Sequence, residues 1–185
     1  MKIAFTGSHG VGKTTLINEL EKELSNSKKI EVTKEIPRII CEVVNNPEYF
    51  RRGQNNLEKQ LLILLGQIIQ EYELSKSNLE IVLCDRTIFD HWAYTLYLFE
   101  KELNDDYIKI IENFLVKHMS SYDKIFYIPI EFEVEDDGTR EDDKEFQTRV
   151  DSLIIRNLEK FKIPYLKITG NVQNRIELVK KELEL

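Results

Sequence analysis

The stretch FTGSHGVGKTTL, residues 5–16, decides the fold that this sequence predicts. It contains the pattern G-x-x-x-x-G-K-[ST], in which Gly7 and Gly12 are followed by Lys13 and Thr14. A strand-length apolar segment precedes the pattern and a helical pattern follows it. A glycine-rich loop in this position directs backbone N–H groups and the helix dipole at an anion. The stretch therefore predicts a loop that binds the phosphates of a nucleoside triphosphate.

The side chains of this loop have separate expected roles. Lys13 is placed to reach the β and γ phosphates, and the Thr14 hydroxyl is placed to bind Mg²⁺. His9 is either an exposed filler or a group that senses the γ-phosphate or a lid. ATP and Mg²⁺ are the expected donor and metal. The predicted nucleotide-binding residues of the loop are Gly7, Ser8, His9, Gly10, Val11, Gly12, Lys13, Thr14 and Thr15.

Strand and helix patterns alternate along the whole chain, which predicts one α/β domain over residues 1–185. The expected sheet is parallel with helices on both faces, so that ligands bind at the carboxyl ends of its strands. Apolar runs of strand length occur at 1–7, 30–34, 79–84, 124–130 and 164–170. Segments with helical periodicity occur at 13–26, 36–46, 55–77, 88–103, 105–120, 143–161 and 171–184.

Composition narrows the setting of the protein. The hydrophobic content of 42% fits a globular domain, and the net charge of −7 argues against a broad nucleic-acid-binding surface. Cys41 and Cys84 both lie in apolar stretches, which indicates reduced thiols in a cytoplasmic protein. The sequence contains no signal-peptide pattern and no apolar run long enough to span a bilayer, so no membrane association is expected.

The pair Asp85-Arg86, at the end of the third predicted strand, separates the classes of P-loop protein. A power-stroke ATPase usually has Glu after this Asp to activate water, and a GTPase needs switch and base-reading motifs that the chain lacks. Here Asp85 is expected to hold Mg²⁺ and Arg86 to bind the substrate or the transferring phosphate. The alternative for Asp85 is a helix N-cap. The pair favours kinase chemistry.

Several motifs together resemble those of a known family. They are FTGSHGVGKTTL, EIPR, DRTIFDHWAY, and DGTR followed by FQTRVD. They look like the small kinase-like P-loop ATPases related to the ribosylnicotinamide kinase domain, and more loosely like thymidylate and deoxynucleoside kinases. The resemblance covers nearly the whole chain. It implies the P-loop hydrolase and kinase fold with strand order 2-3-1-4-5 and a lid, and it implies that Asn171 borders the adenine unless it is only a helix N-cap.

Glu35 and Arg38 follow the second predicted strand, so both are expected near the phosphate loop. If the acceptor is a hydroxyl, Glu35 can take or orient its proton. If the acceptor is a phosphate, Arg38 and Arg86 would bind it. The alternatives are a surface charge or N-cap for Glu35 and a solvated arginine for Arg38.

Two predicted helices contribute further acceptor contacts. Over 55–77, one face is apolar and the opposite face carries Gln60, Gln67 and Glu71, a polar stripe that is either solvated or turned toward the substrate. The resemblance implies that Gln60 and Gln67 contact the acceptor. On the next helix Asp90 and Tyr94 share a face by their i, i+4 spacing and are expected to touch the acceptor sugar or base. The apolar face of 55–77 consists of Leu61, Leu62, Leu65, Ile68, Ile69 and Tyr72.

The acidic segment 131–145 follows the fourth strand, where kinases of this type carry a closing lid at about 131–149. Arg140 and Arg149 resemble lid arginines, which neutralise charge on the transferring phosphoryl group. Arg140 is predicted to be catalytic and Arg149 to bind substrate. The alternative is a solvated loop whose arginines only offset neighbouring acids.

The sequence thus predicts ATP- and Mg²⁺-dependent transfer of a phosphoryl group to a small acceptor, which is a nucleoside, a nucleotide or a nicotinamide-type ribonucleoside. The predicted catalytic groups are Lys13, Glu35, Asp85, Arg86 and Arg140. One alternative is a kinase acting on a base or end of a polynucleotide, which the acidic composition disfavours. Another is a regulatory ATPase module without a small acceptor. Apolar positions in 88–120 could also support a homodimer.

Overall fold

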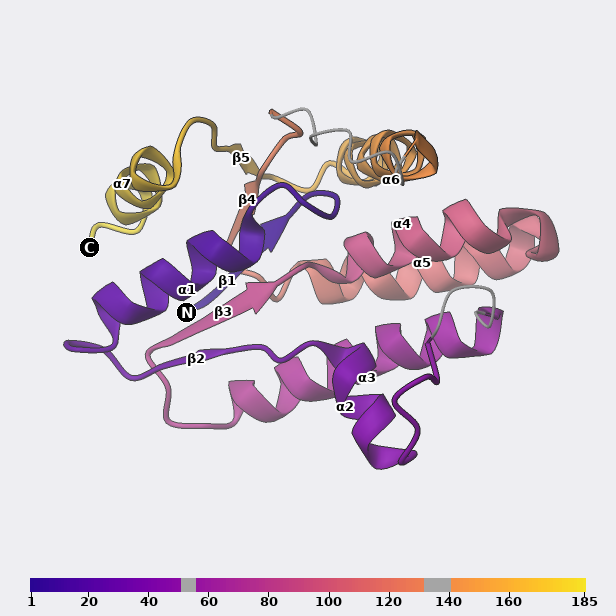
Figure 1. Ribbon diagram of the computed structural model, residues 1–185, viewed down its shortest axis with the longest axis horizontal. Helices are drawn as coiled ribbons and strands as arrows, with labels where there is room; N and C mark the ends of the chain where they lie inside the picture. The colour runs from indigo at the N-terminus through magenta and orange to yellow at the C-terminus, as the bar shows by residue number, and fades with distance from the viewer. Residues whose placement is uncertain (51–55, 132–140) are drawn as a thin grey trace.

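Five parallel strands form the centre of the protein. The computed structural model describes residues 1–50, 56–131 and 141–185 (Figure 1). The strand order is β2-β3-β1-β4-β5 and each pairing is parallel, which confirms the predicted topology. The strand that leads into the phosphate loop, β1, is therefore central. The strands are β1 (Lys2–Thr6), β2 (Ile30–Val32), β3 (Ile81–Asp85), β4 (Lys124–Tyr127) and β5 (Leu166–Lys167).

Helices cover both faces of this sheet, as the alternating pattern predicted. In Figure 1, α1 and α7 lie on one side, and α3, α4 and α5 extend from the other. A short 3-10 turn, η1 (Glu100–Glu102), links α4 to α5. The helices are α1 (Lys13–Leu24), α2 (Ile36–Val43), α3 (Leu57–Ser75), α4 (Ile88–Phe99), α5 (Asp105–Met119), α6 (Glu141–Lys160) and α7 (Val172–Glu182).

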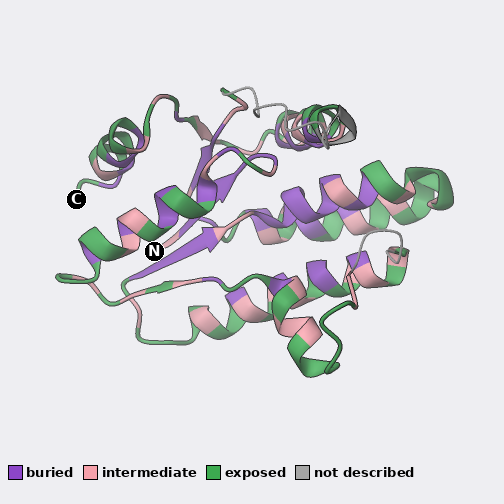
Figure 2. Ribbon diagram, viewed as in Figure 1, coloured by how far each residue is buried: buried purple, intermediate pink, exposed green. Residues whose placement is uncertain are grey.

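The sheet separates two hydrophobic cores because neighbouring side chains on a strand point to opposite faces. Ile3 and Phe5 of β1 join the core that α1 and α7 cover. Ala4, between them, joins the core built with α4, α5 and α6. Figure 2 shows that buried residues follow the strands and the inward sides of the helices. The central strands are covered on both faces, which explains their continuous apolar sequence.

The structure changes the expected element ends by a few residues. The predicted strand at 164–170 shrinks to the two residues of β5, which lies at the edge of the sheet and, among the described strands, pairs with β4 alone. The predicted strand at 30–34 ends at Val32, because α2 begins four residues later with Pro37 in its first turn. A strand at the edge of a sheet forms ladder hydrogen bonds on one side only, so fewer hydrogen bonds stabilise a longer strand there.

Helix α3 buries a face that contains polar as well as apolar residues. Its polar residues Gln60, Gln67 and Glu71 are buried, whereas Ile69 and Tyr72 of its apolar face are 59% and 62% exposed. The interpretation of the polar stripe as solvated is therefore wrong. Because buried polar groups need partners, this orientation points to a polar site beneath the helix.

The two cysteines are unpaired, as expected. Cys84 is buried in β3, where burial raises the pKa of its thiol well above the ordinary value, and Cys41 is half-buried on α2. Within residues 1–50, 56–131 and 141–185, no helix combines the length and the apolarity needed to cross a bilayer.

Candidate active site

The phosphate loop joins β1 to α1, and its glycines have backbone conformations that other residues rarely adopt. Gly7, Gly10 and Gly12 have φ angles of 141°, 75° and 89°. A Cβ atom at Gly7 would lie 2.4 Å from the carbonyl oxygen of Ile128, so there is no room for a side chain. Gly12 is the N-cap of α1, which places the positive end of that helix at the loop. This geometry suits an anion.

Lys13 lies inside the loop with only 4% of its surface exposed. Its Nζ donates hydrogen bonds to the carbonyl oxygens of Gly7 and Ser8. Burial, followed by the nearby Arg86 guanidinium, lowers the pKa of Lys13 to about 7. A buried ammonium with a lowered pKa gains stabilisation when phosphates approach it.

Thr14 and Asp85 form the pair that fits a magnesium ion. The Thr14 hydroxyl donates a 2.6 Å hydrogen bond to Oδ2 of Asp85, so α1 and β3 bring the two oxygens together. Mg²⁺ usually takes one or two protein oxygens together with substrate phosphates and waters. The described residues contain no cluster of three or more His, Cys, Asp or Glu side chains that would form a protein-only metal site. The N-cap of α4 is Thr87, so the N-cap alternative for Asp85 is wrong.

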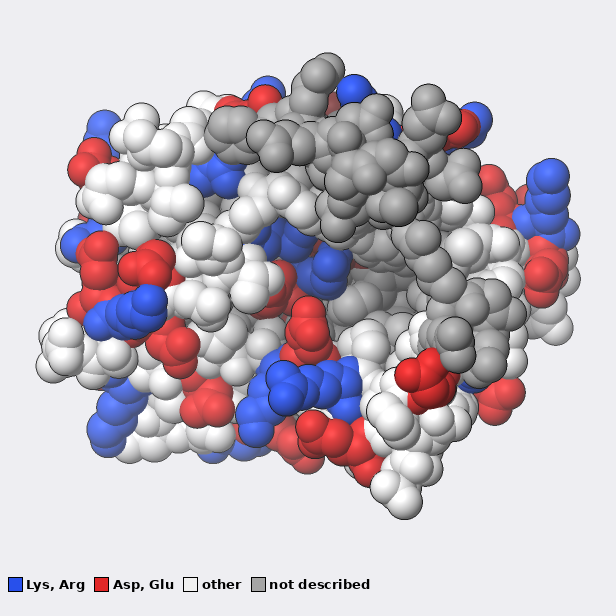
Figure 3. Space-filling model, in the orientation of Figure 1, with Lys and Arg blue, Asp and Glu red and all other residues white. Residues whose placement is uncertain are grey.

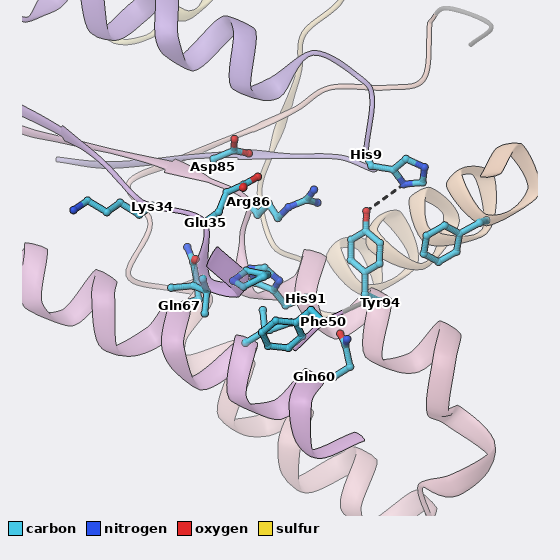
Figure 4. A pocket seen from close by; sticks show the side chains of 14 residues that line it. His9, Lys34, Glu35, Phe50, Gln60, Gln67, Asp85, Arg86, His91 and Tyr94 are labelled. Atoms are coloured by element: carbon cyan, nitrogen blue, oxygen red, sulfur yellow. Dashed lines mark hydrogen bonds between the residues drawn. The ribbon is translucent and has the colours of Figure 1, made fainter. Parts of the chain in front are cut away.

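A cavity of about 470 Å³ adjoins this pair at the carboxyl ends of β2 and β3 (Figure 4). Figure 4 shows Glu35, Asp85 and Arg86 at one end of the cavity and Gln60 at the other. Its apolar wall comes from α2, α3 and α6 and the chain after α2. The polar lining residues are His9, Lys34, Glu35, Gln60, Gln67, Asp85, Arg86, His91 and Tyr94, and the apolar ones are Ile36, Pro37, Phe50, Ile63 and Phe146.

Arg86 lines the cavity and has a strained backbone conformation. Its φ angle is 92°, which is unfavourable for a residue with a side chain and is a common feature of functional sites. The guanidinium lies 5.3 Å from the ring centre of Tyr94, whose hydroxyl is 3.3 Å from Nδ1 of His9. Nη1 of Arg86 is buried and has no hydrogen-bond partner among the described residues. An oxyanion of the substrate would supply that partner.

Glu35 occupies the N-cap position of α2, but its side chain makes no capping hydrogen bond. The carboxylate lines the cavity together with Lys34 and Asp85. The backbone N–H of Asp85 donates to the Thr33 hydroxyl at 3.0 Å, which ties the end of β3 to the chain that carries Glu35. Glu35 thus lies on the cavity wall with its carboxylate not used as a helix cap.

Asp90 does not contact the cavity, which corrects the prediction that it touches the acceptor. The residue is completely buried, and its carboxylate accepts hydrogen bonds from the hydroxyls of Thr6 and Thr87 and from the backbone N–H groups of Gly7 and Thr87. It forms a capping box at the start of α4 and ties that helix to the phosphate loop. Its partner in the i, i+4 pattern, Tyr94, does line the cavity.

Two arginines and one asparagine that were predicted to contact ligands also do not line the cavity. Arg38 has an 80% exposed side chain, lies 3.6 Å from Glu42 and does not line the cavity. Arg149 has a 68% exposed side chain next to Glu145 and is likewise absent from the cavity wall. Both therefore match the solvated alternative. Asn171 is the N-cap of α7, as its alternative proposed, with its side chain accepting from the N–H of residue 174 at 2.9 Å.

The predicted lid lies only partly within the described residues. Arg140 lies outside them, as do most residues of the acidic segment 131–145 that contains it. From the following helix, α6, Phe146 lines the cavity and Gln147 donates a 2.6 Å hydrogen bond to the carbonyl oxygen of His9. Phe146 also packs against His9, with ring centres 5.3 Å apart. Helix α6 therefore contacts the phosphate loop directly.

Two residues near the site were not predicted from the sequence. His91 lines the cavity; burial, followed by Arg86, lowers its pKa to about 4, so the imidazole is neutral. Its Nε2 has no partner among the described residues. Arg175 of α7 donates to the carbonyl oxygen of Val11 and to Glu131, both at 2.8 Å, and so braces the phosphate loop. The spacing of His91 three residues before Tyr94 was an available signal, whereas the role of Arg175 depends on distant parts of the chain.

A sequence profile of the family described as AAA domain matches residues 2–175. The chain belongs to the AAA domain family. A thymidylate kinase from Acholeplasma laidlawii (strain PG-8A) is 24% identical to this AAA domain over 188 residues, a match that covers 97% of this chain and 90% of that protein.

Solved structures resemble this AAA domain over its full length. Thymidylate kinase from Ehrlichia chaffeensis has a TM-score of 0.70 at 23% identity, covering 99% of this chain and 98% of that one. Deoxyadenosine kinase from M. mycoides with dCMP and dCDP has a TM-score of 0.67 at 20% identity, covering 100% and 99%. The NadR protein in complex with NR has a TM-score of 0.70 at 18% identity, and this chain spans 50% of it. The protein thus has the P-loop, kinase-like fold that its motifs resemble.

Proposed function

We propose that this protein is a nucleoside kinase that transfers the γ-phosphoryl group of ATP to the primary hydroxyl of a nucleoside. One observation carries the proposal: a single cavity contains both the Asp85-Arg86 end of β3 and the glutamines of α3, with Glu35 on the same wall near Asp85 (Figure 4). Its volume of about 470 Å³ and its mixed lining suit a base attached to a sugar. The deoxyadenosine kinase named above supports a nucleoside acceptor.

Each group in the site has a role in this reaction. The loop N–H groups and Lys13 bind the β and γ phosphates, while Glu35 accepts or orients the proton of the attacking hydroxyl. Arg86 binds the transferring phosphoryl group through the nitrogen that lacks a partner. Thr14 and Asp85 would hold Mg²⁺, which neutralises charge on the phosphate oxygens when bound. The bond from the γ-phosphorus to the β–γ bridging oxygen breaks as the bond to the acceptor oxygen forms.

A nucleoside monophosphate is the second candidate acceptor, and the named thymidylate kinases favour it. Such an acceptor needs cations for its own phosphate. Lys34 and Arg86 line the cavity, but Arg38, expected to complete a clamp, points to solvent. A hydroxyl acceptor matches the carboxylate of Glu35 better.

The two acceptors can be separated by measuring phosphoryl transfer from ATP and Mg²⁺ to a panel of nucleosides and their 5′-monophosphates. Nucleosides are expected to be phosphorylated, and Glu35→Gln should lower kcat by about 100-fold or more because the general base is lost. The control is Glu31→Gln, which removes the same charge from an exposed position of β2 and should leave kcat unchanged. Phosphorylation of monophosphates alone, with full activity in Glu35→Gln, would assign the second candidate.

The two remaining alternatives predict other results in the same assay. A polynucleotide kinase would need a basic groove, yet Lys and Arg are interspersed with Asp and Glu over the described part of the face in Figure 3. A regulatory ATPase would release phosphate at the same rate with and without an acceptor. Either activity, in the absence of nucleoside phosphorylation, would refute the proposed function.

A further inference from the structure

Two residues of the buried polar stripe of α3, Gln67 and Glu71, are joined by a hydrogen bond. Gln67 lines the cavity and is 2% exposed, and Glu71, one turn later on the same face, is 1% exposed. Nε2 of Gln67 donates a 2.6 Å hydrogen bond to Oε1 of Glu71. Burying a carboxylate is costly unless several donors surround it, so the environment of Glu71 requires an explanation.

Donors from three other elements hold Glu71 in place. Its Oε2 is 2.9 Å from Nζ of Lys2 and 2.8 Å from Nε2 of His118, and its Oε1 accepts from the Tyr122 hydroxyl at 2.8 Å. Burial opposes ionisation, but the hydrogen bond with His118 and the charge of Lys2 outweigh it and lower the pKa of Glu71. Glu71 is therefore a carboxylate, which can only accept hydrogen bonds.

This fixed acceptor determines the orientation of the Gln67 amide. Only the NH₂ group can donate to Glu71, so the carbonyl oxygen lies on the opposite side of the planar amide, in a residue that lines the cavity. Turning the amide over would place its oxygen against a buried carboxylate and remove one of the donors of Glu71. A buried polar group that is left unpaired or repelled is unfavourable, so the turned state is disfavoured.

We propose that Glu71 is a positioning residue that locks Gln67 with its carbonyl oxygen toward the acceptor, so that the site selects nucleosides whose base carries an exocyclic –NH₂ group. Such a group donates a hydrogen bond to the carbonyl oxygen of Gln67. In the oxo counterpart of the same base, a carbonyl oxygen replaces the –NH₂ group. It would face the carbonyl oxygen of Gln67, and no hydrogen bond could form between the two acceptors. Adenine, cytosine and the carboxamide of nicotinamide have this donor. The inference rests on the proposed function, since it concerns the acceptor half of the same cavity.

The test compares matched acceptors that differ only at this group. These are deoxyadenosine with deoxyinosine, deoxycytidine with deoxyuridine, and nicotinamide riboside with its carboxylate analogue. At least one amino or amide member is expected to be phosphorylated with a kcat/KM about 100-fold or more above its partner, because a site built to accept an N–H rejects the analogue that lacks it. Equal kcat/KM values within every pair would overturn the inference.

Variants of α3 distinguish positioning from a merely structural role. Glu71→Gln removes the fixed acceptor, so Gln67 can turn over; the preference within a pair should fall to about threefold or less, mainly through KM, with the KM for ATP unchanged. The control Glu73→Gln makes the same charge change on the exposed side of α3 and should keep the full preference. If Glu71→Gln lowers activity equally for both members and keeps the preference, Glu71 is only structural and the inference fails.

A double-mutant cycle keeps the test decisive if Glu71→Gln is unstable. Gln67→Leu leaves Lys2, His118 and Tyr122 around Glu71 and should abolish the preference by itself. Adding Glu71→Gln to Gln67→Leu should not change the preference further, because the two residues act as one unit. A preference that survives in Gln67→Leu would refute the role of this amide.

Nucleoside binding, measured by calorimetry in the presence of a non-hydrolysable ATP analogue, separates this inference from the proposed function. Tighter binding of the amino members without phosphorylation would support the inference and refute the kinase proposal. Equal phosphorylation of both members of every pair would support the kinase proposal and refute the inference.

Discussion

Replacement of Asp90 with alanine tests the finding that this residue anchors the phosphate loop and does not contact a substrate. The change removes an acceptor of four hydrogen bonds, two from hydroxyl groups and two from the backbone N–H groups of Gly7 and Thr87. The hydroxyls of Thr6 and Thr87 can turn to other acceptors. The two N–H groups cannot, and they would be left buried without a partner.

The expected loss of stability follows from these two groups. Each unsatisfied buried donor costs about 1–3 kcal/mol, and the cost at Thr87 includes the loss of the α4 capping box, so the total is about 2–6 kcal/mol. For a domain of this size, about 1 kcal/mol corresponds to about 2–4 °C, so Tm should fall by about 4–24 °C. Asp90→Asn should lose less, because its remaining oxygen can keep the bonds to Thr87.

Urea unfolding and thermal scanning would measure this loss, with Asp106→Ala as the control. Asp106 has a 91% exposed side chain 3.9 Å from Lys109, so its removal should change stability by less than about 0.5 kcal/mol. At a temperature where Asp90→Ala is folded, its KM for ATP should rise more than its KM for the acceptor. An unchanged Tm with a raised acceptor KM alone would show that Asp90 contacts the substrate after all.

Three further predictions concern the donor half of the site. Gly7→Ala should lower the free energy of unfolding by about 3 kcal/mol or more relative to wild type in urea unfolding, because the φ of 141° at this position is strained for alanine and the added Cβ would lie 2.4 Å from a carbonyl oxygen. At pH 8, Lys13 with its pKa of about 7 is mostly neutral, and bound phosphates raise that pKa, so ATP binding should take up close to one proton. The binding enthalpy of ATP, measured by calorimetry in several buffers, should therefore rise with the ionisation enthalpy of the buffer, and Lys13→Met should abolish this dependence. A wild-type binding enthalpy that does not depend on the buffer would refute the lowered pKa. Arg175→Met should raise the KM for ATP by about 10-fold, because the carbonyl oxygen of Val11 loses a charged donor. The control Arg156→Met changes a more exposed arginine and should match wild type. Equal KM values for ATP in the two variants would show that Arg175 does not brace the phosphate loop.

Local patterns were sufficient to predict the sheet and the phosphate loop. The glycine spacing before Lys13 specifies a backbone that few other residues can adopt, and the apolar runs specify strands buried on both faces. The pair Asp85-Arg86 was placed correctly for a similar reason, because parallel strands end at one edge of the sheet. Gln60 and Gln67 also line the cavity, although the sequence alone favoured a solvated face.

Residues whose surroundings come from distant segments could not be placed in this way. The i, i+4 spacing puts Asp90 and Tyr94 on one face of α4, but it does not show that the phosphate loop covers the first and leaves the second at the cavity. Arg38 and Arg149 follow predicted site segments, yet exposed ion pairs with their own helices hold both at the surface. Helical periodicity gives the direction of a side chain relative to its helix, not relative to the rest of the molecule.

The sequence by itself determined a P-loop α/β fold and the donor half of the site, because the phosphate loop is a local structure whose backbone geometry is encoded in consecutive residues. Only the tertiary structure decided which face of α3 is buried. Lys2 at the start of the chain and His118 and Tyr122, about fifty residues beyond Glu71, meet around its carboxylate and make a buried polar stripe stable. Those contacts are long-range, and no pattern within α3 reports them. They hold Glu71 as the acceptor of the amide N–H of Gln67, a residue that lines the cavity.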